Sequence, residues 1–110
     1  MQQSELMKEI VNTYRKHGWK WRRILVRPET KEDLNLAFEA NELELIQIED
    51  GDVDALWFSR ASRAEREAWE LRLLAETPFA LFETFEKDET EEQREEMRRE
   101  MEALLKDRTK

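Results

Sequence analysis

Apolar positions recur at helical spacing near both ends of the chain. At the N-terminal end they predict a helix over residues 4–17, which Ser4 would cap and Gly18 would end. Near the other end we expect a helix over residues 89–107, capped by Asp88 or by a capping box of Thr90 and Gln93. Only its second half carries an apolar stripe, so the first half should project into solvent or lie against a charged surface. The stripe consists of Met97, Met101, Leu104 and Leu105.

The pattern between these helices is typical of strands. Aromatic and β-branched residues over 19–27 predict a strand that Pro28 ends. A short helix is expected over residues 31–40, with Thr30 as a weak cap. Residues 43–48 and 53–58 should form a hairpin, because Asp50 and Gly51 lie between them and Gly51 can supply the positive φ that the turn requires.

Two physical arguments disagree about residues 62–74. Helix propensity, and a capping box formed by Ser62 and Glu65, favour a helix. Strict alternation of Trp69, Leu71 and Leu73 with polar residues favours a strand. We expect residues 67–74 to form a hairpin with residues 79–86, and the helix remains the alternative.

Together these elements predict an α+β fold. It consists of an about five-stranded, mainly antiparallel sheet, with the N-terminal and C-terminal helices packed on one face. The chain of 110 residues is expected to form a single domain, 1–110, with the C-terminal helix partly projecting. Because the strands carry apolar residues on both faces, the uncovered face should attract a partner, and a symmetric homodimer is the commonest solution.

Composition excludes several classes of site. The chain has no Cys, one His, two Gly and two Pro. It therefore has no disulfide or thiolate metal site, no pair of imidazole ligands, and no glycine-rich phosphate loop. No apolar run approaches the roughly 20 residues of a membrane span, and the N-terminus lacks a signal-peptide pattern. We therefore expect a cytoplasmic protein with no membrane partner.

The acidic residues do not form a recognisable metal or catalytic motif. Asp50, Asp52 and Asp54 alternate like the start of a calcium loop, but its sixth and twelfth positions are Ala55 and Ala61 in place of Gly and Glu. No serine lies in a nucleophile elbow, and 27 acidic residues bring carboxylates together by chance. We expect no metal, no cofactor, no catalytic residue and no enzymatic activity.

Charge is divided along the chain more sharply than the net charge of −8 suggests. Residues 14–27 hold six bases and no acid, whereas residues 29–54 hold ten acids and one base. We interpret the two blocks as neighbours that neutralise each other in the fold. The alternative is a basic surface that attracts an anionic partner.

The basic block interleaves aromatic and basic residues. Strand alternation places Trp19, Trp21 and Arg23 on one face and Lys20 and Arg22 on the other. Such a pattern can bind single-stranded nucleic acid, but overall acidity and the absence of an RNA-binding motif argue against that partner. We interpret the rings as part of the core and the bases as partners of acidic neighbours.

The leading hypothesis is a small, acidic, non-enzymatic protein that acts through protein–protein interaction, as a homodimer. The alternative is a binder of nucleic acid or another anionic ligand through residues 19–27. The candidate partner-binding residues are Trp19, Lys20, Trp21, Arg22, Arg23, Met97, Met101 and Leu104.

Overall fold

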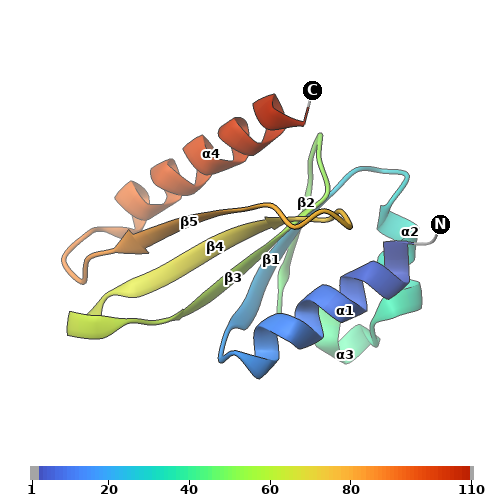
Figure 1. Ribbon diagram of the computed structural model, residues 1–110, viewed down its shortest axis with the longest axis horizontal. Coiled ribbons are helices and arrows are strands. Elements are labelled where there is room, and N and C mark those ends of the chain that lie inside the picture. The colour runs from blue at the N-terminus through green and yellow to red at the C-terminus, as the bar shows by residue number, and fades with distance from the viewer. Residues whose placement is uncertain (1–2, 110) are drawn as a thin grey trace.

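The computed structural model describes residues 3–109, which form a five-stranded mixed sheet with helices on both sides (Figure 1). The strand order is β2-β1-β3-β4-β5, with β1 and β2 parallel and every other pair antiparallel. The predicted α+β class and the mainly antiparallel sheet are therefore confirmed. The strands are β1 (Lys20–Val26), β2 (Gln47–Asp50), β3 (Ala55–Ala61), β4 (Glu67–Leu73) and β5 (Ala80–Phe85).

Both long helices form where the apolar spacing predicts them. The first, α1, already includes Gln3, so Ser4 lies inside it and is not its cap; it is followed by Gly18, whose φ is +84°. In α4 the Thr90 hydroxyl accepts from the Gln93 amide and the Gln93 side chain accepts from the Thr90 amide, which confirms the capping box. No helix within residues 3–109 is long and apolar enough to cross a membrane. The helices are α1 (Gln3–Lys16), α2 (Lys31–Ala37), α3 (Ala40–Leu43) and α4 (Glu91–Arg108).

The terminal helices cover opposite faces of the sheet, so the expectation that both pack on one face is wrong (Figure 1). Strands with apolar residues on both faces need a cover on each. The α1-side core consists of Met7, Ile10, Val11, Trp19, Trp21, Ile24, Val26, Leu34, Leu56, Phe58, Ala68 and Leu74. The α4-side core consists of Leu25, Ala55, Trp57, Trp69, Leu71, Phe85, Met101 and Leu105.

The predicted hairpin of residues 43–48 with 53–58 is wrong, because β1 lies between β2 and β3. Residues 40–43 form α3, and β2 starts only at Gln47. The chain passes from β1 through α2 and α3 to reach β2, a crossover of the kind that parallel strands require. No tight turn is then needed at Gly51, and of the two glycines only Gly18 has a positive φ.

The hairpin of β4 and β5 agrees with the alternating pattern, and Leu71 pairs with Leu81 across it. The capping box expected at Ser62 does not begin an α-helix. Residues 63–65 instead form the 3₁₀ turn η1 (Arg63–Glu65), in which Ala64 and Glu65 have positive φ angles of 57° and 60°. The strand pattern outweighs helix propensity here because Trp69 and Leu71 both become buried on the α4 side.

Asp54 joins the start of β3 to the loop between β1 and α2. Its carboxylate accepts from the backbone amide of Arg27 at 2.8 Å and from its Nε and Nη2 at 3.0 and 2.9 Å. The Thr30 hydroxyl donates to the same carboxylate at 2.8 Å and does not cap α2. Asp54 is thus a buried acceptor that holds two loops together.

Candidate anion-binding cleft

A β-bulge in β1 decides where the basic side chains lie. Trp21 pairs with Phe58, whereas Arg23 pairs with the neighbouring Trp57, so Arg22 is an extra residue without a partner on β3. The extra residue shifts the alternation of the strand. Trp21 stays in the α1-side core with Phe58, whereas Arg23 moves to the α4 side with Trp57. The prediction that Arg23 shares a face with Trp21 is therefore wrong.

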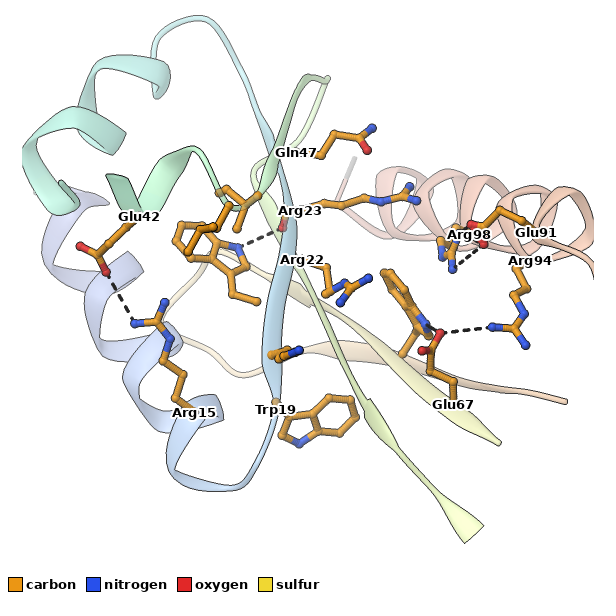
Figure 2. Close-up of a pocket in the computed structure, with 15 residues that line it drawn as sticks. Arg15, Trp19, Arg22, Arg23, Glu42, Gln47, Glu67, Glu91, Arg94 and Arg98 are labelled. Carbon is orange, nitrogen blue, oxygen red and sulfur yellow. Dashed lines mark hydrogen bonds and ion pairs between the residues drawn. The ribbon is translucent and has the colours of Figure 1, made fainter. Parts of the chain in front are cut away.

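The bulge brings the bases of β1 into one cleft with two arginines of α4 (Figure 2). This basic cleft has a volume of about 900 Å³ and extends along β1, from Arg15, Glu42 and Leu45 at one end to the N-terminal half of α4 at the other. Six cations line it against three carboxylates, so it is locally positive in a chain whose net charge is −8. The cations are Arg15, Lys20, Arg22, Arg23, Arg94 and Arg98, and the carboxylates are Glu42, Glu67 and Glu91.

Ion pairs hold several of these cations in place. Arg94 contacts Glu67 at 3.3 Å, and Arg23 contacts Glu95 of α4 at 2.9 Å. Arg98 contacts Glu95 at 3.0 Å, and also pairs with a second carboxylate of α4. Burial raises the pKa of Glu95, but hydrogen bonds from Arg98 and Arg23 outweigh it and leave the pKa below its ordinary value of 4.5.

Two other cations of the cleft have no carboxylate partner. Lys20 and Arg22 are exposed, and among residues 3–109 no acidic side chain forms an ion pair with either. The Nε atoms of Arg94 and Arg98 are buried and have no hydrogen-bond partner. The expectation that the acidic block neutralises the basic block holds only at Arg15 and Arg27. The cleft therefore keeps an excess of positive charge and of N–H donors.

Arg98 forms the floor of the cleft. Only 1 % of its surface is exposed, and its Cζ lies 3.9 Å from the centroid of the Trp69 ring and 5.3 Å from that of Phe85. Burial of a charge is unfavourable unless partners compensate for it, and here two carboxylates and two aromatic rings do so. A positive charge is thus fixed in place before any ligand arrives.

Sequence reasoning missed Arg94 and Arg98, because the first half of α4 was expected to have nothing to bury. Their spacing contains the signal that could have found them. Arg94, Arg98, Met101 and Leu105 follow one another at intervals of four, three and four residues, so they share one helical face. The face of α4 that carries Met101 and Leu105 therefore continues towards the N-terminus with Arg98 and Arg94.

The other predicted partner-binding residues are buried in the two cores or lie outside the cleft. Trp19 and Trp21 are 9 % and 6 % exposed and pack in the α1-side core, although both also contribute to the wall of the cleft. Met101 is buried in the α4-side core with Met97 packed against it, whereas Leu104 is 61 % exposed. The structure thus brings Lys20, Arg22 and Arg23 together and separates them from the methionine stripe.

Within residues 3–109 no group of three or more acidic or imidazole side chains is placed to hold a metal ion. Comparison of the chain with protein-family models, curated proteins and solved structures finds no match. The basic cleft is therefore the feature whose chemistry points to a function.

Proposed function

We propose that this protein is a non-enzymatic binding protein that recognises an anionic ligand in the basic cleft. The observation that carries the proposal is the pair Lys20 and Arg22, which share the cleft with buried Arg98 and have no acidic partner. The chain has 27 acidic and 19 basic residues, so acidic partners are in excess. Two basic residues that share one hollow and have no acidic partner therefore create a local positive charge in an acidic protein. An anionic ligand would supply the missing partners.

The chemistry of the cleft suits such a ligand. Guanidinium groups bind carboxylate and phosphate oxygens through paired N–H donors, and charge-assisted hydrogen bonds are stronger than neutral ones. Arg23 and Arg94 are already positioned by their ion pairs with Glu95 and Glu67. Less conformational entropy is then lost when a ligand binds.

The carboxylates of the cleft support binding in preference to catalysis. Glu67 and Glu91 each bond to a guanidinium group, and Glu42 lies 3.6 Å from Arg15. These contacts engage the oxygens that a general base would direct towards a substrate. We therefore include the absence of catalysis in the proposal.

A homodimer remains a prediction, but an uncovered sheet face does not support it. The apolar surfaces of both sheet faces pack against helices of the same chain. The large apolar residues that are exposed within residues 3–109 lie on separate segments and form no sheet face for a second copy. They are Leu36, Leu45, Ile48, Phe82 and Leu104.

An NMR titration with sodium tripolyphosphate tests the proposal. We expect the amide signals of Lys20, Arg22 and Arg23 to shift, and the affinity to fall with added salt because screening shortens the reach of the charges. The double variant Lys20→Ala/Arg22→Ala should lose most of the binding.

The matched control is Lys16→Ala/Arg108→Ala, which removes the same charge from two helix ends that do not line the cleft. If both double variants lose the same affinity for tripolyphosphate, the binding depends only on the net charge of the protein, and the proposal is overturned. Signal changes confined to residues outside the cleft would overturn it as well.

A further inference from the structure

The basic cleft continues into a second hollow of about 570 Å³. Four residues, Lys20, Arg22, Glu67 and Arg94, line both hollows, so the two form one continuous groove. The two cations without acidic partners lie at the junction. The basic groove, as we call it, comprises the basic cleft together with this second hollow.

The second hollow extends the positive charge. It adds three cations, but Arg66 pairs with Glu86 at 2.9 Å and Lys87 pairs with Glu65 at 2.8 Å, so Arg60 is the one that brings charge without an ion pair among residues 3–109. Arg60 has no ion pair either: its Nη1 donates to the His17 carbonyl at 3.0 Å, and its Cζ lies 4.5 Å from the centroid of the Trp19 ring. Arg60 together with Lys20 and Arg22 at the junction gives three cations without acidic partners in the groove, which suits an extended anion better than one compact anion.

The aromatic rings beside the groove argue against nucleic acid. Trp69 is 3 % exposed and covered by a guanidinium group, and Trp19 is covered by Arg60. Nucleobases would therefore find no open ring on which to stack. Glu42 of the acidic block 29–54 also lines the groove, so a long polyanion would meet repulsion there.

An apolar side chain at the rim favours a peptide. Leu45 is 84 % exposed and lines the same cleft as Lys20 and Arg22. A peptide that combines acidic residues with an apolar one would satisfy both features, whereas an inorganic anion would use only the charges.

Resting on the proposed function, we infer that the ligand is an extended acidic segment of another protein, bound along the basic groove. Its carboxylates bond to Lys20, Arg22 and Arg60, and an apolar side chain contacts Leu45. The protein is then an interaction module for acidic peptides, which specifies the chemistry of its partner.

A glutamate peptide of about eight residues tests this inference, because an extended chain rises about 3.3 Å per residue and would span about 26 Å. The protein itself measures 41 × 30 × 24 Å. Fluorescence anisotropy would compare this peptide with one in which leucine replaces a terminal glutamate, and with an oligothymidylate of equal charge. We expect the leucine-containing peptide to bind most tightly and the oligothymidylate most weakly.

Variants separate an extended ligand from a compact one. Arg60→Ala should weaken the peptide about tenfold, since a charge-assisted hydrogen bond is lost, and should weaken tripolyphosphate much less, because Arg60 does not line the basic cleft itself. Leu45→Ser should remove the advantage of the leucine-containing peptide. Arg63→Ala is the matched control, because Arg63 is an exposed arginine of the adjacent turn that does not line the groove.

The outcomes distinguish the two proposals. Tripolyphosphate binding without peptide binding would refute the acidic peptide and leave the anion-binding function standing. Tighter binding of oligothymidylate than of either peptide would replace the peptide with nucleic acid. Peptide binding that is insensitive to Arg60→Ala would refute the extended mode. Failure of every probe would refute both proposals.

Discussion

The guanidinium group of Arg98 lies over the Trp69 ring, with its Cζ 3.9 Å from the ring centroid. Trp69 in turn contacts Trp57 and Phe85, with ring centroids 5.9 and 6.5 Å apart. The first half of α4 thus packs on the sheet through a cation, and the second half through apolar side chains such as Met101. Arg98 consequently contributes to both helix packing and the charge of the basic cleft.

Replacing Arg98 should separate its packing from its charge. We expect Arg98→Ala to lower the free energy of unfolding by about 2 to 3 kcal/mol, because a buried side chain and its cation–π contact are lost. Arg98→Met should cost only about 1 kcal/mol, because methionine refills the space and contacts the Trp69 ring. Urea denaturation measures both.

Arg99 provides the comparison for that experiment. It also pairs with carboxylates, at 2.8 to 2.9 Å, but its side chain is 47 % exposed. Arg99→Ala should therefore cost at most about 1 kcal/mol. A loss for Arg98→Ala no larger than this would contradict the described packing of α4.

Tyr14 should resist ionisation in the folded protein. Its hydroxyl donates to Glu70, and its ring stacks on Phe58 with centroids 4.0 Å apart. Burial raises the pKa of Tyr14 above its ordinary value of 10.0, and the hydrogen bond to Glu70 and the charge of Glu70 raise it further. Tyr14 is the only tyrosine, so the near-ultraviolet absorbance of tyrosinate reports this group alone.

The direction of this shift also sets a pH dependence. Because the folded-state pKa of Tyr14 exceeds the unfolded value of 10.0, its contribution to stability is fully present below pH 10 and is lost as the pH rises above that value. Glu70→Gln should lower the pKa of Tyr14 towards 10.0, but burial of the ring should still keep this pKa above 10.0. Ionisation of Tyr14 at its ordinary pKa in the folded wild-type chain would exclude the described contact.

Two neighbouring apolar positions of α4 should respond very differently to truncation. Met101 is 4 % exposed in the α4-side core, so Met101→Ala should lower the free energy of unfolding by about 2 to 4 kcal/mol. Leu104 is 61 % exposed, so Leu104→Ala should change it by no more than about 0.5 kcal/mol. Similar losses of stability at both positions would contradict the described orientation of α4, in which Met101 faces the core and Leu104 faces solvent.

Leu104 also offers a test of the predicted homodimer. If two copies associate through this helix, Leu104→Glu should shift the sedimentation coefficient from that of a dimer to that of a monomer without changing stability. A wild-type chain that sediments as a monomer would remove both the homodimer and the partner-binding role of Leu104.

The elements whose signals are local can be predicted from the sequence. The spacing of Met7, Ile10 and Val11 predicts α1, and the capping box at Thr90 places the start of α4. The alternation at Trp69 identifies β4 against its helical propensity. Such patterns suffice because each residue's conformation depends mainly on neighbours within a few positions.

Long-range contacts in the folded protein set which strands pair and which faces the basic residues occupy. The insertion of β1 between β2 and β3 is a long-range choice that no turn signal encodes, and it overrode the hairpin expected at Gly51. The bulge at Arg22 depends on the register with β3, yet it turns Arg23 towards α4. Arg98 became a buried residue only because Trp69 lies opposite it. The cleft therefore arises from contacts between segments that are distant in sequence. The pattern of residues along the chain does not contain the free energies of these contacts.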